Sequence, residues 1–447
     1  MWGNAHFNIN NPPAENEKKQ YFKDNNKEII EAIVKDDVDA LSEIIEADGD
    51  SVNQEFGFDD QYLPRFLSSA PPIICVAAYF NAINIVQFLM SCGADLAKQD
   101  LLGRTVIHFA MTSCNLDIVR ELDDGSIDFK TPDKNGNQPI HVACEFGFFD
   151  GVKYIHMKCG EDALLAMNNS LTIPLLVAAY NGHLEIIQFF KEIGLNILDC
   201  DSNGLNALHY ACAGGQADVA KYLIENGMDV DRTGHDSDTP ILYAAQNGNL
   251  ETVKILVESG SKKYKQKNAK RSCLVEAASF GHADVIRYLV SMGADIYTTN
   301  SSGNSILSVA IDNNQPEVIK YLIKVGLKPH RSDFQKMLTN SFHDGNLELF
   351  KMVWKMIGNL SQSEYDNFLN LICPPNYFSS SDEPKEYKCV RYMIKKGVVF
   401  SSSAITSFLL KSYTRFYCPK DVLESLKKMS PSSFKRRAII TSWGRFY

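Results

Sequence analysis

Three histidines are the residues most able to do chemistry in this chain of 447 residues. Histidine is the commonest general base and metal ligand, and His108, His141 and His209 recur in one local context, after an aliphatic residue and two positions before alanine. The motifs HExxH, GxxxxGK[ST], GxSxG and a phosphate-binding GxGxxG after a strand do not accompany them. The sequence gives no support for an enzyme, and we expect no catalytic residue, metal or cofactor.

The cysteine content favours a reducing compartment. Eleven cysteines, an odd number without paired spacing, are typical of free thiols rather than of disulfides or zinc sites. No run of about 18 apolar residues is present, and the N-terminus has neither a basic nor an apolar signal region. We therefore expect no membrane insertion and a cytoplasmic location, with the nucleus as the alternative.

Six glycines recur at nearly constant spacing. Successive members of the set are 34 residues apart once and 33 residues apart four times, and each closes a similar phrase, such as Glu185 to Gly194 or Asp284 to Gly293. A fixed period between about 20 and 50 residues is typical of stacked repeat proteins. The six are Gly160, Gly194, Gly227, Gly260, Gly293 and Gly326.

Local signals predict a helix–turn–helix within each period. Asp or Asn followed by Gly two or three residues later indicates a tight turn. Thr239 stands where a helix needs an N-cap, and Pro240 follows at the first helical position. Second helices carry apolar residues at helical spacing, as Val219, Tyr222 and Leu223 do. One such unit cannot bury its apolar face alone, so we expect stacking to build the core.

These phrases resemble the ankyrin-repeat family. The segments Asp100 to Ala110, Asp133 to Ala143 and Asp201 to Ala211 are similar to the family's turn and Thr-Pro-Leu-His helix start, and Gly281-His282 and Gly293-Ala294-Asp295 are similar to its later motifs. The resemblance implies an all-α ankyrin-repeat solenoid of stacked helix–turn–helix units joined by β-turn or hairpin loops, about ten to eleven units including degenerate ends. It also implies that the recurring histidine ties its helix start to the neighbouring turn, and that the protein binds rather than catalyses.

Weaker regions flank the regular repeats. The second regular repeat is expected to have a short outer helix, because Arg120 to Gly125 lacks the usual apolar end. We expect a flexible polar arm over residues 1–26, a degenerate capping repeat with a loop insertion over 27–67, eight repeats over 68–332, two degenerate repeats over 333–399, and a basic helical cap or tail over 400–447.

Charge is distributed unevenly along the chain. The net charge is −9, yet residues 384–447 hold 14 Lys/Arg against 3 Asp/Glu, so the first 383 residues hold the remaining 31 basic and 51 acidic residues. Three interpretations remain open: the ends attract each other, the tail contacts an acidic partner, or solvated helix faces merely differ in charge.

The resemblance places candidate partner-binding residues on two surfaces. Ankyrin-repeat proteins bind partners through their turn tips and through the first-helix positions just before Gly-His. Aromatic residues occupy four of the eight first-helix pairs, which favours contact hot spots; the alternative is that these rings are half-buried against neighbouring repeats. The candidates are Tyr79, Phe80, Phe146, Tyr180, Asn181, Gln246, Asn247 and Phe280 on the helices, and Leu101, Leu102, Arg104, Lys270 and Arg271 at the tips.

We therefore expect a monomeric, non-enzymatic scaffold that binds a partner protein on its first-helix surface and turn tips. The alternative is a substrate adaptor of a ubiquitin ligase that docks through its C-terminal region, because Ser430 to Ile440 resembles part of a SOCS box but departs at that motif's Leu and Cys positions. Lys435-Arg436-Arg437 is too short to indicate a nucleic-acid patch, so nucleic acid is not expected as a partner.

Overall fold

The computed structural model describes residues 26–48, 52–57, 63–265, 271–357, 360–371, 386–412 and 420–430. Within these ranges the chain forms helices and three isolated β-bridges but no strand, which confirms the predicted all-α repeat fold. The expected arm up to residue 25, the candidate Lys270 and the tail from 431 onward lie outside the described residues.

The chain divides into two compact units, residues 1–266 and 267–447. This boundary falls inside the segment for which the sequence predicts eight repeats.

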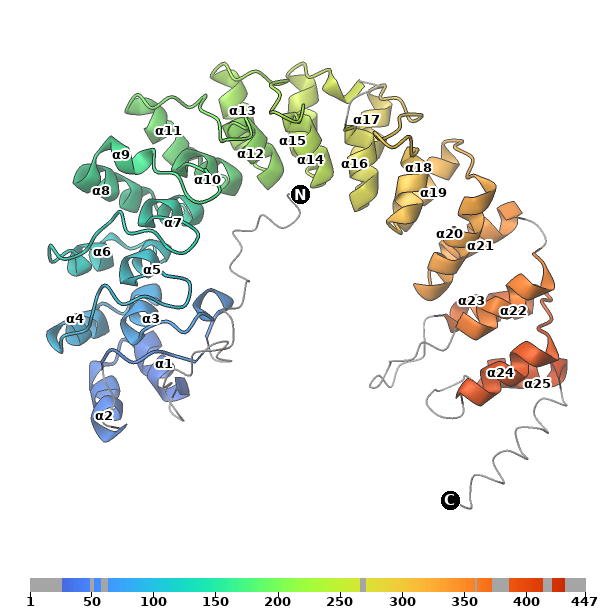
Figure 1. Cartoon of the computed structure of the whole chain (residues 1–447), viewed down its shortest axis with the longest axis horizontal. Helices are drawn as coiled ribbons and strands as arrows, with labels where there is room; N and C mark the ends of the chain where they lie inside the picture. The colour runs from blue at the N-terminus through green and yellow to red at the C-terminus, as the bar shows by residue number, and fades with distance from the viewer. Residues whose placement is uncertain are drawn as a thin grey trace. The chain divides into compact units, whose positions relative to one another are not determined.

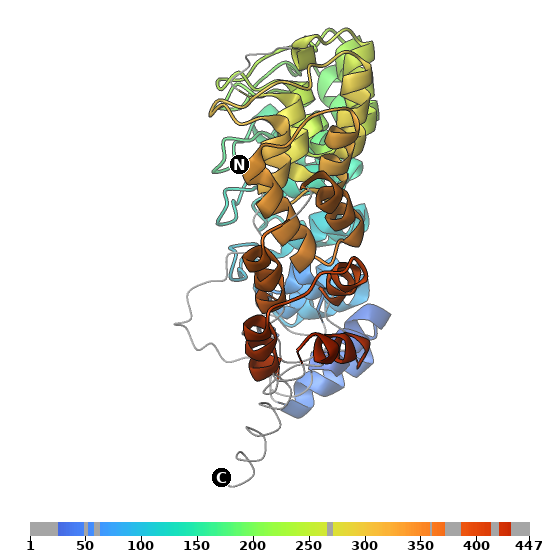
Figure 2. The ribbon, with the colours of Figure 1, turned by 90° about the vertical axis from the view of Figure 1, so that its right-hand side faces the viewer.

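Helices of the first unit form two layers (Figure 1). Each repeat contributes one inner and one outer helix, and the connecting loops project to one side of the layers (Figure 2). The inner helices are α3 (Ile73–Tyr79), α5 (Val106–Thr112), α7 (Pro139–Phe146), α10 (Pro174–Asn181), α12 (Ala207–Gly214) and α14 (Pro240–Gln246). The outer helices are α4 (Ile83–Ser91), α6 (Leu116–Leu122), α8 (Phe149–Cys159), α11 (Leu184–Glu192), α13 (Ala217–Glu225) and α15 (Leu250–Glu258). The unit also holds α1 (Asn26–Lys35), α2 (Val38–Asp48), α9 (Glu161–Leu164) and the 3-10 helices η1 (Arg65–Leu67) and η2 (Lys263–Lys265).

The second unit continues with helix pairs. Its last two helices pack onto the preceding pair, α24 on α22 and α25 on α23, and the Arg391 guanidinium pairs with both Asp421 carboxylate oxygens between α23 and α25. The helices are α16 (Cys273–Phe280), α17 (Ala283–Ser291), α18 (Ile306–Asp312), α19 (Pro316–Lys324), α20 (Arg331–His343), α21 (Leu347–Ile357), α22 (Gln362–Leu371), α23 (Tyr387–Lys395), α24 (Ser402–Ser412) and α25 (Lys420–Met429).

Apolar spacing decides which face of each outer helix is buried. In α13, Val219, Ala220 and Leu223 are buried and so form the stripe that faces the core.

Helix α6 has seven residues against nine in α4, which confirms the short outer helix predicted for this repeat.

The turns follow from Asp or Asn at a fixed position. Asp100 Oδ1 accepts hydrogen bonds from the backbone N–H groups of Leu102 and Arg104, at 2.9 and 2.8 Å. Gly103 in the same turn takes a φ of +78°. Glycine suits this left-handed conformation because it has no Cβ. The same two hydrogen bonds from backbone N–H groups recur in four other turns, where the accepting side chains are Asp133, Asn168, Asp201 and Asn300.

The recurring histidines join neighbouring repeats. The backbone N–H of Thr105 donates to His108 Nδ1 at 3.2 Å, and His108 Nε2 donates to the Asn137 carbonyl of the next turn at 3.1 Å. His141 and His209 make the equivalent pairs of bonds, and all three rings are buried. The predicted structural role of these histidines is confirmed.

Acid should weaken the fold through these imidazoles. Burial lowers the pKa of His108, His141 and His209 to about 4, so each ring is neutral in the fold while the unfolded chain binds protons below about pH 6.5. Their stabilisation is complete above pH 6.5 and is lost as the pH falls from there to about 4. At pH 5 each should contribute on the order of 1–2 kcal/mol less to the free energy of unfolding than at pH 7.5, measured by urea denaturation.

His141→Gln should reduce this pH dependence by about one histidine's share. The comparison is made between a chain with His141 and a chain with His141→Gln, and both also carry Glu145→Gln. Burial raises the pKa of Glu145 to about 7, so that its carboxyl lowers the free energy of unfolding as the pH rises from 4.5 to 7, which is opposite to the effect of the histidines. An unchanged pH dependence would contradict the account.

Candidate partner-binding surface

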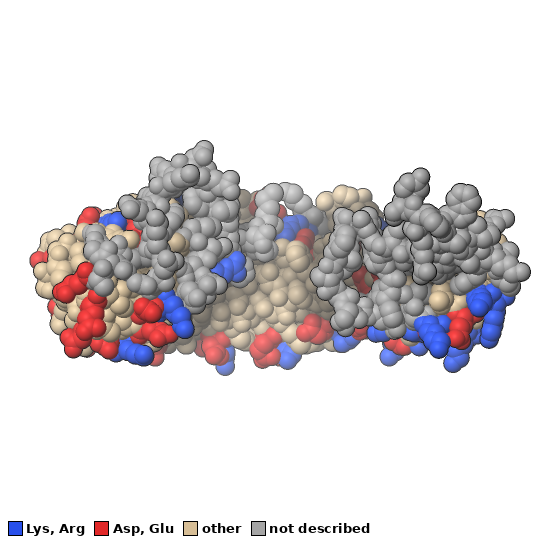
Figure 3. Space-filling model, turned by 90° about the horizontal axis from the view of Figure 1, so that it is seen from below, with Lys and Arg blue, Asp and Glu red and all other residues tan. Residues whose placement is uncertain are grey.

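The inner helices of the first unit are almost free of charge. Among α3, α5, α7, α10, α12 and α14, Glu145 is the one residue of type Asp, Glu, Lys or Arg. Figure 3 shows an expanse of uncharged surface with the charged side chains gathered along its edge. The exposed face of these six helices is called the inner face below.

The candidate helix residues differ in accessibility. Phe280 in the second unit is exposed, at 46% of its surface, whereas Gln246 is buried at 2%. The expectation that Gln246 faces solvent is wrong because all seven residues of α14 are buried. The half-buried candidates are Tyr79, Phe80, Phe146, Tyr180, Asn181 and Asn247.

The candidate tip residues are less exposed than expected. Leu101 and Leu102 are half-buried, and Arg271 is half-buried against Glu276, with 3.1 Å between its Nε and the carboxylate. Arg104 is only 4% exposed, so its expected place on the tip surface is wrong.

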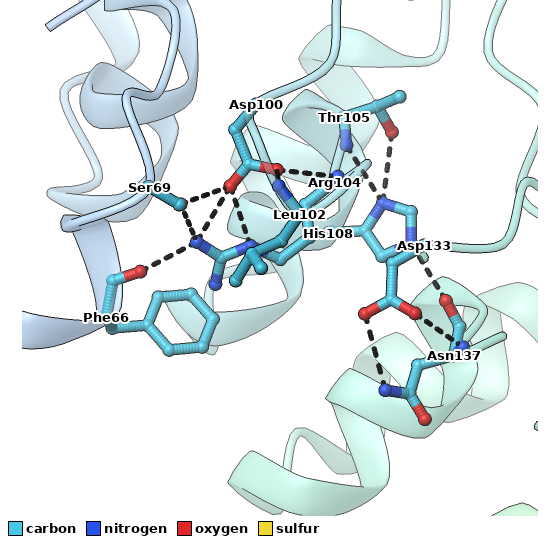
Figure 4. Close-up of polar contacts among 9 residues, drawn as sticks. All are labelled: Phe66, Ser69, Asp100, Leu102, Arg104, Thr105, His108, Asp133 and Asn137. Carbon is cyan, nitrogen blue, oxygen red and sulfur yellow. Dashed lines mark hydrogen bonds and ion pairs between the residues drawn. The ribbon is translucent and has the colours of Figure 1, made fainter. Parts of the chain in front are cut away.

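Arg104 turns inward because buried acceptors surround it (Figure 4). Its Nε donates to Asp100 Oδ2 at 2.8 Å, and one terminal nitrogen donates to the Phe66 carbonyl at 2.8 Å and to Ser69 Oγ at 2.6 Å. The guanidinium carbon also lies 4.3 Å from the Phe66 ring centre and 4.5 Å from that of Phe109, within the range of cation–π attraction. Arg104 therefore fastens the segment Pro64–Ser69 to the repeats.

Phe66 brings this segment onto part of the inner face. Its ring stacks on Tyr79 with centroids 5.8 Å apart, and meets Phe146 edge-on at 5.4 Å and Phe109 at 5.8 Å. The rings of Tyr79 and Phe146 are thus engaged by the chain itself, which agrees with the half-buried alternative for these two. Sequence reasoning placed a loop insertion here but missed Phe66, whose only signal is an aromatic residue in that loop.

Tyr180 is more available than these rings. In the part of the chain that the structure describes, no aromatic ring contacts the half-buried ring of Tyr180. Its carbonyl accepts from Gln216 Nε2 at 3.1 Å, just as His183 Nε2 donates to the Glu145 carbonyl at 2.9 Å and Asn249 Nδ2 to Cys212 at 2.9 Å. These bonds give hydrogen-bond donors to carbonyls near the ends of α7, α10 and α12 and link each of these three helices to the next repeat.

Glu145 is the second residue that sequence reasoning did not select. Its side chain is half-buried, and among the described residues its carboxylate makes no hydrogen bond or ion pair. Burial raises its pKa to about 7; the charge of Arg104 acts against this rise and that of Asp133 adds to it. The signal was available, since Glu145 is the one charged residue in six inner helices.

The described residues show neither a metal centre nor a membrane span. No group of three or more His, Cys, Asp or Glu side chains among them is placed to hold a metal ion. None of the described helices is long and apolar enough to cross a membrane.

Comparison with known families agrees with the fold. A family model described as ankyrin repeats in three copies matches residues 74–167, 152–234, 175–268 and 241–333, more than half of the chain. The chain therefore belongs to the ankyrin-repeat family, whose members generally mediate protein–protein interactions.

Individual relatives are similar over about a third of the chain or less. Alpha-latrotoxin-Lg1a of Latrodectus geometricus is 36% identical over 141 residues, which are 30% of this chain and 10% of that protein. The ankyrin and armadillo repeat-containing protein of Mus musculus is 32% identical over 147 residues, 31% of this chain and 10% of its own. NF-kappa-B inhibitor alpha of Gallus gallus is 25% identical over 120 residues, 26% of this chain and 38% of its own. The chain thus spans about a tenth of the length of the first two.

Arg104→Lys should loosen the segment Pro64–Ser69. A lysine ammonium lacks the planar fork that reaches Asp100, Ser69 and the Phe66 carbonyl together, and Asp100 would remain buried without an equal partner. We expect a loss of about 2 kcal/mol in the free energy of unfolding and faster amide hydrogen exchange over residues 63–69. Arg120→Lys, at a side chain that is 61% exposed, is the control and should change neither. Unchanged exchange in the Arg104 variant would contradict the fastening role.

Gly214→Ala should separate α10 from α12. A Cβ on Gly214 would lie 1.9 Å from the Tyr180 carbonyl oxygen, a backbone atom that cannot rotate away. We expect overpacking to cost about 1–3 kcal/mol in thermal or urea unfolding, whereas Ala213→Ser on the same turn should cost about 0.5 kcal/mol or less. Equal stability of the two variants would show that the helices are not held this closely.

Proposed function

We propose that this chain is a non-enzymatic interaction protein that holds a partner protein along the inner face and turn tips of its repeats. The observation that carries the proposal is the composition of the inner face. Six helices with a single charged residue leave a broad surface on which a partner can bury contacts without desolvating many charges. Half-buried aromatic and amide side chains on that surface suit protein recognition.

The comparisons support a binding role. Ankyrin-repeat proteins generally mediate protein–protein interactions, and one relative is named as an inhibitor of NF-kappa-B.

The central part of the inner face suits a partner best. The ring of Phe66 already covers the rings of Tyr79 in α3 and Phe146 in α7, so contact with a partner at these two side chains would need to displace the segment Pro64–Ser69. At α10 and the end of α14, the half-buried Tyr180, Asn181 and Asn247 are not covered in this way. We place the main contact on α7, α10, α12 and α14.

The cysteines support a reducing compartment. All nine cysteines in the described residues are free thiols, and burial raises the pKa of the Cys144 and Cys212 thiols and so lowers their reactivity. We propose a cytoplasmic monomer, with the nucleus as the alternative location.

Tyr180→Ser should reduce partner recovery, because it removes an aromatic contact from the middle of the inner face. The measurement is cross-linking affinity purification with quantitative mass spectrometry of the full chain, with circular dichroism to verify helicity. The recovered amount of a direct partner should fall at least tenfold, which is a typical loss for a contact hot spot. Phe280→Ser, in the second unit, measures whether the contact extends beyond the first unit.

Met157→Ser is the matched control. Met157 lies on the outer helix α8 and is 69% exposed, so the variant removes an exposed apolar side chain outside the inner face. Its partner set should equal that of the unaltered chain. If Tyr180→Ser and Met157→Ser recover the same partners in full amounts, the inner face is not the binding surface.

A further inference from the structure

Glu145 is a carboxylate without an ion-pair partner among the described residues. It lies one residue before the end of α7, is half-buried, and is the one charged residue of the six inner helices. Among the described residues its carboxylate has neither an ion pair nor a hydrogen bond. Burying a carboxylate without such partners opposes folding, so its presence here calls for a role beyond packing.

The surrounding groups do not supply that counterpart. Arg104 is the cation whose charge acts on Glu145, but its guanidinium is bound to Asp100, Ser69 and the Phe66 carbonyl. Asp133 adds a negative charge nearby, and His183 uses its Nε2 on the Glu145 backbone carbonyl. A carboxylate in such a setting is a candidate functional group.

We infer that Glu145 anchors a single lysine or arginine side chain of the partner, within a segment that is otherwise uncharged where it lies along α7, α10, α12 and α14. This inference rests on the proposed function and specifies the chemistry of the partner.

Charge complementarity leads to a single basic residue. A lysine or arginine placed against Glu145 gains a partly desolvated ion pair, which the surrounding uncharged surface shields from water. A second charge of either sign on the same segment would lose water against inner helices that offer no other charged side chain. The inner face therefore selects for one basic residue and against further charges.

A selection from random peptides tests this directly. A phage-displayed library of random dodecapeptides is selected at pH 8 against the full chain and, in parallel, against E145Q, an uncharged side chain of nearly the same shape. Peptides from the unaltered chain should share one lysine or arginine position flanked by uncharged residues. In the synthetic peptide, replacing that residue with glutamine should weaken binding to the unaltered chain at least tenfold, and binding to E145Q less than twofold.

The pH dependence of binding gives an independent readout. Burial raises the pKa of Glu145 to about 7, so its ionised fraction rises about tenfold between pH 6 and pH 8. The affinity of the basic peptide for the unaltered chain should rise by up to about tenfold over that range and stay flat in E145Q. His183 and Asp133, which lie near Glu145, are the same in both proteins, so equal pH profiles for the unaltered chain and E145Q would overturn the role of Glu145.

Tyr180→Ser separates the two proposals. The role of Glu145 is overturned if the selected peptides depend on Tyr180 but share no basic position, or if they bind E145Q as well as the unaltered chain. Either result leaves the inner face as the binding surface. A library that yields no peptide dependent on either Tyr180 or Glu145 overturns the proposed function and the role of Glu145 together.

Discussion

The hydrogen bond from a buried histidine to the next repeat is the interaction that holds α5, α7 and α12 of the first unit to their neighbours. In each case, Nδ1 accepts from the backbone at the start of the histidine's own helix, and Nε2 donates to a carbonyl in the following turn, as His108 does to Asn137. Two further sets of bonds run in parallel: side chains such as Gln216 satisfy the last carbonyls of the preceding inner helix, and turn tips bond to one another, as Lys134 N does to the Leu102 carbonyl at 2.8 Å. The repeats that these bonds join do not complete their buried hydrogen bonds alone, so each of them is stabilised by its neighbour.

Because these hydrogen bonds lie between the repeats, the inner face remains available to bind a partner. The stack is held by backbone and side-chain groups that point into the interfaces between repeats, whereas the half-buried ring of Tyr180 makes no hydrogen bond or aromatic contact among the described residues. The segment around Phe66 shows how the surface can be used, because the chain itself fills one part of it with an aromatic ring and a buried cation. Glu145 lies one residue before the end of α7 and lacks the cation that Asp100 has.

Much of the fold could be predicted because its causes are local. The Asp-to-Gly turn, the histidine at the helix start and the short α6 each depend on residues within a few positions of one another. The contacts of Arg104 depend instead on Phe66 and Ser69, which lie 38 and 35 residues earlier in an insertion without a repeat pattern, so its burial could not be predicted. The burial of Gln246 follows from the packing of a whole helix, which residue type alone does not reveal. The candidate partner-binding residues themselves stay a prediction, since repeat architecture does not name a ligand.

The central claim is that a partner protein contacts the inner face of the first unit. The most direct measurement is photo-cross-linking in cells from a photoreactive phenylalanine analogue placed at Tyr180, with the same analogue placed at Met157 on the outer face of α8. We expect the analogue at Tyr180 to capture a discrete partner and the analogue at Met157 to capture none, and we expect the captured peptide to map to a largely uncharged segment. Capture of the same partner from Met157 but not from Tyr180 would contradict it.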